Sequence, residues 1–344
     1  MNTTTKQQGG AIVTLLLLIF ILAAAGYWLW HDYQRFRSSP LQISGLGVNY
    51  QVKPGTSLME VASDLSEKGI LRQPFYLRAL ALDMGVSNKI KAGEYLILAK
   101  TTPEKLLDQL VRGKVLEYSL TLIEGWNFKQ ALAAVRIHPM IVQTLTSLST
   151  DQIMERLGHA GVYPEGRFFP DTYLFPRGTT DADVLKRAYQ RMEKVLAQEW
   201  QARAEGLPIK TPYEALILAS IVEKETGVAG ERTQVAGVFT RRLQKGMLLQ
   251  TDPTVIYGMG DSYDGNIRRK DLRTDTPYNT YVHSGLTPTP IALPGREAIH
   301  AALHPADGDA LYFVATGQGG HYFSATLKEH NQAVQKYQIN RNKH

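Results

Sequence analysis

The segment from Gly10 to Trp30 constrains this chain most, because it is apolar throughout and carries no charged residue. A helix of about 20 apolar residues is long enough to cross the hydrocarbon core of a bilayer. Tyr27, Trp28 and Trp30 stand at its carboxy-terminal end, as aromatic side chains do at a membrane interface. The sequence therefore predicts a transmembrane helix over residues 10–30, preceded by a cytoplasmic tail of residues 1–9.

A cleaved signal peptide is the alternative to an uncleaved anchor. Residues 23–25 are three alanines that resemble a cleavage site, but the apolar run continues to Trp30, which favours an anchor. Lys6 precedes the span while Arg35 and Arg37 follow it, so the positive-inside rule is nearly neutral. The short polar tail and the large remainder indicate a single-pass signal anchor, with the carboxy-terminal part of the chain outside.

Composition sets wider bounds on the class of protein. With 344 residues and 44% hydrophobic content, the chain can form roughly two domains with cores of their own. A net charge of +6 suits an anionic partner, such as a membrane surface, an acidic cell-wall polymer or nucleic acid. The basic residues are scattered rather than aligned, which argues against nucleic acid. The absence of cysteine excludes disulfides, thiol nucleophiles and cysteine-ligated zinc.

The local patterns predict an α+β protein with a small first module. We expect a linker over residues 31–43, an α+β module over 44–120 and a larger α+β domain over 121–344. In the module, Ser57 and Glu60 form a capping box that opens a helix ending near Gly69. The turn and cap at residues 52–58 resemble the start of a LysM module, a glycan-binding fold, but such a turn and cap are common and taken alone favour plain helix initiation. The other module elements expected are strands at 48–52, 93–98 and 115–123, and helices at 74–82 and 102–113.

The larger domain is expected to be mainly helical. Its proline-rich segment at 161–178 excludes a long helix there, and the chain after residue 245 is expected to be loop-rich as far as Pro294. The helical patterns cover residues 127–157 with a break at His138-Pro139, 181–203, 211–226, 231–245, 297–303 and 326–340, and strands at 311–315 and 322–323 are expected to pair.

One acidic residue marks the end of an apolar helix at residues 211–226. The helix opens with a Thr211–Glu214 capping box and is then apolar on nearly every side, as a buried helix is. Glu223 shares a face with Ser220 and other small or apolar residues, and apolar surroundings raise the pKa of a carboxyl. A carboxyl with a raised pKa can act as a general acid. The alternative is a solvated Glu beside Lys224 in a fraying last turn.

A second carboxyl, Glu225, follows two residues later. Side chains two residues apart on a helix point about 200° away from each other, so Glu223 and Glu225 cannot line one cleft. The pattern is therefore not the paired-carboxylate site of a usual glycosidase. We expect Glu225 to be a structural partner of Lys224 or Arg232. Either Asp252 or Asp171 could be brought to Glu223 by folding.

Two later loops are rich in hydrogen-bonding and aromatic side chains. Residues 250–258 and 278–291 combine such side chains with prolines, which suits sugar binding but is also ordinary turn chemistry. His304, His321 and His330 have no metal-ligand spacing, and the glycines at 317–320 form a hairpin turn rather than a phosphate loop. The sequence predicts neither a metal ion nor a cofactor.

Five ordered segments together resemble one family, the endolytic murein transglycosylases, also called MltG or YceG-like lytic transglycosylases. One departure is Thr287–Pro290, where the family has a Pro-Pro-Gly-Pro-like run. The matching segments are Glu165–Tyr173, Leu218–Thr226, Val238–Tyr257, Tyr278–Tyr281 with Gly285-Leu286, and Gly319–Phe323.

This resemblance implies an activity. It implies that Glu223 is the catalytic acid, that the bond cleaved is the β-1,4 link between N-acetylmuramic acid (MurNAc) and N-acetylglucosamine (GlcNAc), and that a 1,6-anhydro-MurNAc end results. One carboxyl suffices, because the C6 hydroxyl of the substrate attacks C1 and benefits from its proximity. It further implies a lysozyme-like helical active-site region on the periplasmic side of the inner membrane. The implied role is to end glycan-strand elongation alongside peptidoglycan synthases. The candidates to hold the glycan are Ser220, Gln250, Thr251, Asp252, Tyr257, Tyr278, Asn279 and Tyr281.

Two other functions fit the same residues. A non-catalytic, membrane-anchored peptidoglycan-binding scaffold would use the same glycan-holding loops. A true muramidase would hydrolyse the bond with water and leave a reducing end.

Overall fold

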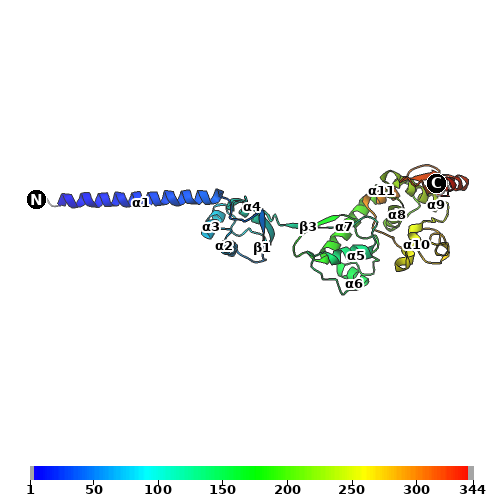
Figure 1. The fold of residues 1–344 in the computed structure, drawn as a ribbon, viewed down its shortest axis with the longest axis horizontal. Coiled ribbons are helices and arrows are strands. Elements are labelled where there is room, and N and C mark those ends of the chain that lie inside the picture. Colours follow the sequence, from blue (N-terminus) through cyan, green and yellow to red (C-terminus); the bar gives the residue numbers. More distant parts are fainter. Residues whose placement is uncertain (1–3, 340–344) are drawn as a thin grey trace. The chain divides into compact units, whose positions relative to one another are not determined.

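The computed structural model describes residues 4–339, with side chains from residue 12 onward, and has a mixed α+β fold (Figure 1). The chain divides into two compact units that meet between Tyr118 and Ser119. The first three residues of the predicted tail, and Asn340 at the end of the predicted last helix, lie outside the described residues.

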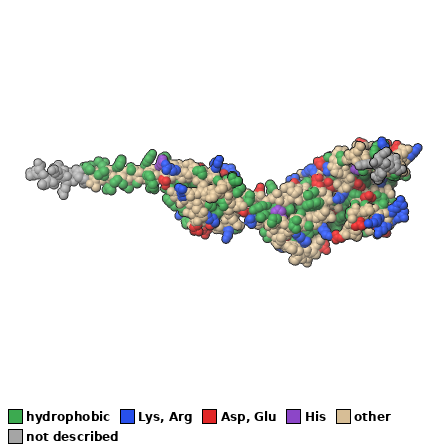
Figure 2. Space-filling model, in the orientation of Figure 1, with side chains coloured by type: hydrophobic (Ala, Val, Ile, Leu, Met, Phe, Trp, Pro, Cys, Tyr) green, Lys and Arg blue, Asp and Glu red, His purple; other side chains and the backbone are tan. Residues whose placement is uncertain are grey.

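The first unit begins with one long helix, α1 (Thr4–Ser38). By length and composition, residues 12–38 of this helix could cross a membrane, and none of its most apolar window is buried by the protein. Figure 2 shows these hydrophobic side chains exposed along the helix. The predicted apolar helix is therefore present, but it continues through most of the segment expected as a linker. It ends shortly before Pro40, since the residue before a proline is disfavoured in the helical conformation.

The end of α1 belongs to the core of the first unit. Phe36 is 8% exposed and Leu41 is 6% exposed, and both pack in the same hydrophobic cluster as the rest of this unit. The Tyr76 hydroxyl donates to Asp32 at 3.0 Å, and Arg37 forms an ion pair with Glu104 at 3.0 Å. Residues 31–41, which include the end of α1, therefore pack against this unit and do not form a separate linker.

Three further helices and a two-stranded sheet complete the first unit. The Ser57–Glu60 capping box is formed as predicted, and Gly113 ends the last of these helices with φ 70°. Antiparallel pairing places Gly47 opposite Leu98 and Val52 opposite Gly93. The elements are β1 (Gly47–Val52), α2 (Leu58–Glu67), α3 (Pro74–Asp83), β2 (Gly93–Leu98) and α4 (Pro103–Arg112).

The second unit is mainly helical, as expected. Two pairs of strands, β3 with β4 and β5 with β6, lie at different points of the chain, and β5 and β6 form the predicted antiparallel hairpin. The elements are β3 (Glu117–Thr121, which contains the unit boundary), α5 (Phe128–Ile137), α6 (Thr150–Leu157), β4 (Thr172–Pro176), α7 (Asp181–Gln201), α8 (Pro212–Glu225), α9 (Arg232–Gln244), α10 (Asp252–Met259), α11 (Arg296–Leu303), β5 (Tyr312–Ala315), β6 (His321–Ser324) and α12 (Leu327–Val334). Short 3₁₀ turns lie at Ala229–Glu231, Gly260–Ser262 and Asp271–Arg273, and a π-helical turn, Gln335–Ile339, follows α12.

Helix α8 is the centre of the second unit. Every residue from Ala215 to Val222 is buried, and the helix packs against α7, α9, α10 and α11. This confirms the buried helix predicted from its all-round apolar sequence. The Thr211 side chain caps it by accepting from the Glu214 N–H, but the Glu214 carboxylate accepts from Lys210 N–H, so the predicted reciprocal box is not formed.

The largest difference from the predicted elements is α10. The segment expected as a proline turn in a loop-rich region forms a helix, with Pro253 in its first turn, where a missing N–H costs nothing. Two residues of this helix, Thr254 and Val255, are buried. This helix separates two cavities that carry most of the candidate site residues.

Candidate active site

Glu223 is held by a backbone amide and a cation. Its side chain is 7% exposed, and its Oε2 accepts a hydrogen bond from Gly295 N–H at 2.9 Å. Arg232 Nη2 lies 3.9 Å from Glu223 Oε1 and 3.9 Å from Glu124 Oε2. Burial raises the pKa of Glu223 above its ordinary value, in the direction expected from the sequence, while the Gly295 bond acts against this rise.

Glu225 lies in different surroundings. It is partly buried and accepts a hydrogen bond from the Thr251 hydroxyl. Burial raises its pKa, and the neighbouring Asp252 charge adds to the rise, while His321 and Arg242 oppose it. The expectation that Glu225 pairs with Lys224 or Arg232 is therefore wrong, because Lys224 donates to the Gly125 carbonyl and Arg232 faces Glu223.

Glu225 opens into a cavity of about 450 Å³, which we call the acid cavity. Parts of α8, α9, α10, the β5–β6 hairpin and α12 contribute to its wall. Three residues predicted from sequence to hold a glycan lie in the same wall. Its polar and charged lining residues are Glu225, Arg242, Gln250, Asp252, Tyr281, Tyr312, His321, His330 and Gln338.

Polar contacts fix several of these side chains. The Tyr281 hydroxyl donates to Asp252 Oδ1 at 2.6 Å, and His321 Nδ1 lies 2.7 Å from Glu231 Oε2. Arg242 is 7% exposed and directs its guanidinium to backbone carbonyls, including that of Leu311 at 2.7 Å. The acid cavity is thus preorganised around one carboxyl with a raised pKa.

A second cavity of about 760 Å³, which we call the tyrosine cavity, lies on the other side of the same chain segments. Lys224 and Pro253 line it, whereas the next residue of α8 and the preceding residue of α10 line the acid cavity. The end of α8 and the start of α10 therefore separate the two cavities. Four tyrosines line the tyrosine cavity beside a glutamate, namely Tyr163, Tyr257, Tyr263, Tyr278 and Glu165.

Glu165 is a buried carboxyl that the sequence analysis did not select. It is 4% exposed, accepts from Phe128 N–H at 2.9 Å, and accepts from the Tyr257 hydroxyl at 3.1 Å. Burial raises its pKa to about 7, against the effect of these hydrogen bonds. Its place at the start of the Glu165–Tyr173 motif was the available signal, but sequence alone does not show the depth of burial.

The predicted glycan-holding residues fall into three groups. Gln250, Asp252 and Tyr281 line the acid cavity, with Thr251 bonded to Glu225, and Tyr257 and Tyr278 line the tyrosine cavity.

The third group is buried and bonded internally. Ser220 is fully buried, donates to the Ile217 carbonyl and accepts from Ile291 N–H at 2.9 Å. Asn279 is 1% exposed, and its amide donates to the carbonyls of Asp271 and Thr274. The geometry gives these two residues structural contacts rather than free polar groups.

One group within the described residues has metal-ligand composition. Glu199, His300 and His304 bring one ligand atom each to within 4.8 Å of one another. The carboxylate already accepts from Arg296 at 2.5 Å and contacts His300 Nδ1 at 3.0 Å, while His304 Nε2 lies 2.7 Å from the Ala202 carbonyl. These side chains are used in joining α7 to α11.

Comparison with known proteins gives consistent matches. The model of the YceG-like family matches residues 50–336. A Bacillus subtilis (strain 168) protein named endolytic murein transglycosylase is 30% identical over 315 residues, which cover 86% of each chain. A Streptococcus pneumoniae serotype 2 (strain D39 / NCTC 7466) protein of the same name is 26% identical over 351 residues, covering 91% of this chain and 62% of that longer protein.

A solved structure is also similar. The crystal structure of a YceG-like protein from Listeria monocytogenes superposes with a TM-score of 0.53 at 26% identity. The match covers 84% of this chain and 99% of that one. The likeness therefore extends to the fold of most of the molecule.

Proposed function

Because the chain belongs to the YceG-like family, we propose that it is a membrane-anchored endolytic peptidoglycan lytic transglycosylase. The relatives from Bacillus subtilis and Streptococcus pneumoniae bear the name endolytic murein transglycosylase, which supports this activity. The substrate would be the MurNAc-β-1,4-GlcNAc bond within nascent glycan strands. Cleavage would leave a 1,6-anhydro-MurNAc end and stop elongation of the strand.

We assign the catalytic acid to Glu225. The observation that carries this choice is that Glu225 lines the acid cavity together with Gln250, Asp252 and Tyr281. Glu223, the acid expected from the sequence, instead accepts from Gly295 N–H and faces Arg232, and it lines neither of the two cavities described above. Glu223 remains the competing candidate, and the experiment below separates the two.

The reaction needs one carboxyl that changes its protonation state. Protonated Glu225 donates its proton to the glycosidic oxygen as the bond from C1 of MurNAc breaks. The resulting carboxylate accepts the proton of the C6 hydroxyl while O6 bonds to C1, which regenerates the acid. The raised pKa of Glu225 keeps the proton available, and the Thr251 hydroxyl orients the carboxyl.

The remaining glycan-binding assignments follow the two cavities. Gln250, Asp252 and Tyr281 would contact the sugars at the scissile bond. Tyr257 and Tyr278 would contact sugars further along the strand, because aromatic rings pack well against sugar faces. Ser220, Thr251 and Asn279 would support the site rather than contact the glycan directly.

The proposal includes finer assignments of fold and location. We propose that residues 44–120 form a LysM-like module and that the helices around α8 form a lysozyme-like active-site region. We further propose that α1 anchors the chain in the inner membrane with both units on the periplasmic side, close to peptidoglycan synthases. The exposed apolar surface of α1 supports the anchor.

The test is mass spectrometry of purified peptidoglycan after digestion by the wild type, Glu225→Gln and Glu223→Gln. We expect internal cuts with 1,6-anhydro ends from the wild type. Loss of the acid should reduce the Glu225→Gln rate by about 10²–10⁴-fold. Glu223→Gln should stay within about tenfold of the wild type, because it retains the Glu225 proton.

The other outcomes identify the alternatives. Loss of cleavage in Glu223→Gln alone would return the catalytic role to Glu223. Reducing ends would indicate a hydrolase, with Asp252 as the first candidate for its second carboxyl. Binding to peptidoglycan without cleavage by any of the three proteins would favour the non-catalytic scaffold.

A further inference from the structure

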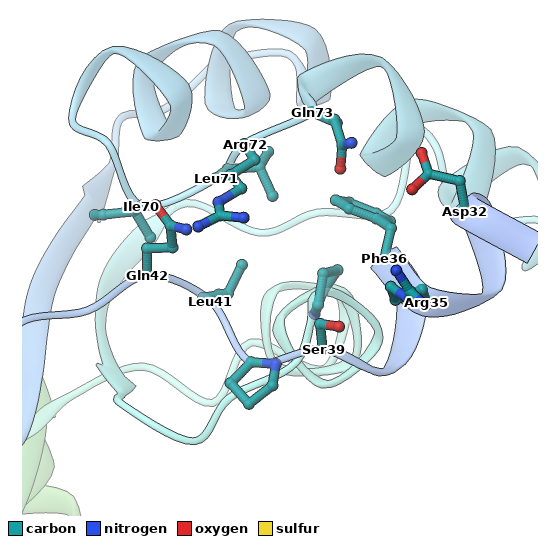
Figure 3. Close-up of a pocket in the computed structure, with 12 residues that line it drawn as sticks. Asp32, Arg35, Phe36, Ser39, Leu41, Gln42, Ile70, Leu71, Arg72 and Gln73 are labelled. Atoms are coloured by element: carbon teal, nitrogen blue, oxygen red, sulfur yellow. The ribbon is translucent and has the colours of Figure 1, made fainter.

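A cavity of about 370 Å³ lies in the first unit where α1 ends (Figure 3). Its wall combines the last turns of α1 and the segment that follows them with the α2–α3 connection and the start of α4. We call it the helix-exit pocket. The residues that matter below are Asp32, Arg35, Phe36, Gln42 and Arg72.

The helix-exit pocket holds two guanidinium groups and one carboxylate. Arg35 and Arg72 are both exposed and come from different elements of its wall (Figure 3). Within residues 4–339 the Arg35 side chain makes no hydrogen bond or ion pair, whereas nearby Arg37 is paired with Glu104. The Asp32 carboxylate already accepts from the Tyr76 hydroxyl at 3.0 Å.

Arg72 is oriented from within the pocket. With its amide oxygen turned toward Arg72, Gln42 accepts hydrogen bonds from that guanidinium. The pocket therefore contains the guanidinium of Arg72, which Gln42 holds, and the unpaired guanidinium of Arg35. These two positive charges exceed the single negative charge of the Asp32 carboxylate. The planar N–H groups of arginine match phosphate oxygens well. The chemistry of the pocket therefore suits an anionic phosphate.

The position of the pocket along α1 identifies the source of that phosphate. Arg35 is five residues beyond Trp30, the last aromatic residue of the apolar stretch, a rise of roughly 8 Å along a helix. The headgroup layer on each side of a bilayer is about 5–7 Å thick. If Trp30 marks the membrane interface, Arg35 lies at the level of the lipid headgroups.

The pocket is fixed relative to the helix. Phe36 is buried in the core of the first unit, and Tyr33 makes an edge contact with Tyr76, their ring centres 5.7 Å apart. Arg72 is therefore held beside the exit of α1 rather than free to move away from the membrane surface.

We propose that the helix-exit pocket binds the headgroup phosphate of an anionic membrane lipid through Arg35 and Arg72. This inference rests on the membrane anchoring in the proposed function, but not on its catalytic part. A bound lipid would fix the first unit against the membrane surface. The same charge chemistry could accept free phosphate, so the test must separate the two sources.

The test uses the full-length protein in bilayer nanodiscs that contain equal amounts of phosphatidylglycerol and phosphatidylcholine. Native mass spectrometry counts the lipids that remain bound after release from the nanodisc. We expect the wild type to retain phosphatidylglycerol selectively. Arg35→Gln with Arg72→Gln should lower this selectivity by roughly fivefold for each arginine.

The matched control is Arg78→Gln, an exposed arginine of α3 that does not line the pocket. It should behave as the wild type does. Equal phosphatidylglycerol retention by the wild type and the double variant would overturn the proposal. Displacement of the retained lipid by millimolar inorganic phosphate would also overturn it, since the pocket would then be a site for a free anion.

Cleavage of peptidoglycan by the same proteins in detergent keeps this result separate from the catalytic proposal. The double variant should cleave at the wild-type rate, because neither arginine lies in the second unit. If the lipid experiment gives the expected result but none of the proteins cleaves peptidoglycan, only the catalytic proposal is refuted.

Discussion

At the scale of single residues, the two carboxyls at the end of α8 show how a short spacing separates two environments. Glu223 and Glu225 are two positions apart on a helix, so their side chains diverge by about 200°. Glu223 accepts a hydrogen bond from Gly295 N–H, and Glu225 accepts one from the Thr251 hydroxyl. Both have raised pKa values, so titration alone does not identify the acid, and the lining of the acid cavity becomes the deciding observation.

The proposed role of Glu225 predicts a pH dependence. The protonated carboxyl is the active form, so the cleavage rate should fall as pH rises through its raised pKa. Well above that pKa the decrease should approach about tenfold for each pH increment of one. The measurement is the cleavage rate against pH, with Glu223→Gln as the control that keeps the same alkaline limb. A limb that disappears in Glu223→Gln would contradict the assignment.

Glu165 predicts a pH-dependent stability. Its folded pKa of about 7 lies above the ordinary value of 4.5, so folding favours the protonated form. The stability it contributes is fully present below pH 4.5 and is lost as pH rises through 7. The loss is at most about 3 kcal/mol, from the free energy of a pKa change of this size.

Glu165→Gln should remove this dependence. The amide oxygen can still accept from Phe128 N–H, and the Tyr257 hydroxyl can accept from the amide NH₂. Urea unfolding at pH 5 and pH 8 should therefore show a smaller pH difference for the variant than for the wild type. Glu193→Gln, an exposed change on α7, is the control. An unchanged difference in Glu165→Gln would show that Glu165 is ionised in the folded protein.

At the scale of elements, α8 positions the site because neighbouring segments are bonded to it at defined points. The Ser220 hydroxyl accepts from Ile291 N–H, and Glu223 accepts from Gly295 N–H just before α11. A Cβ at Gly295 would lie 1.9 Å from Glu124 Oε1, so a side chain there would require the half-exposed Glu124 carboxylate to move. These contacts fix the 291–295 segment against α8.

Ser220→Ala should loosen this attachment. It leaves the buried Ile291 N–H without its acceptor, which costs about 1–3 kcal/mol. Chemical denaturation of the variant measures the loss, and Ser66→Ala in the first unit serves as a control. The cleavage rate should fall by less than it does in Glu225→Gln, because Ser220 makes no contact with the acid cavity. A variant with unchanged stability but no cleavage would instead make Ser220 a direct glycan contact.

At the scale of the whole molecule, each of the two units has its own hydrophobic core. The core of the first unit includes residues from the end of α1, so its boundary lies inside the helix rather than after it. Phe36 and Leu41 would both be lost from a fragment that begins at the predicted module boundary, residue 44.

A fragment of residues 31–344 should therefore be more stable in its first unit than one of residues 44–344. Removal of a buried phenylalanine alone costs about 3–5 kcal/mol. Amide hydrogen exchange can measure the two units separately, and the second unit, which contains α8, should be equally protected in both fragments. Equal protection of α2 and α3 in the two fragments would show that α1 adds nothing to the core.

Local chemistry made many elements of this protein predictable. Three features depend only on residues that are neighbours in the chain: the apolar sequence of α8, the Ser57–Glu60 capping box and the glycine that follows α4. Each could therefore be predicted from the sequence alone. Family membership was equally accessible, because five ordered motifs are specific when taken together. The helix α10 was missed because its Asp-Pro start is shared by turns and helices, and only burial of Thr254 and Val255 distinguishes them.

The grouping of the site residues depended on tertiary structure. Sequence spacing showed that Glu223 and Glu225 diverge, but which of them meets a cavity depends on where residues 250–252 and 281 fold against α8. Burial of Glu165 likewise depends on Phe128 and Tyr257, which are distant in the chain. Helix periodicity and caps arise from neighbouring residues, whereas cavities and raised pKa values arise from what distant segments exclude from water.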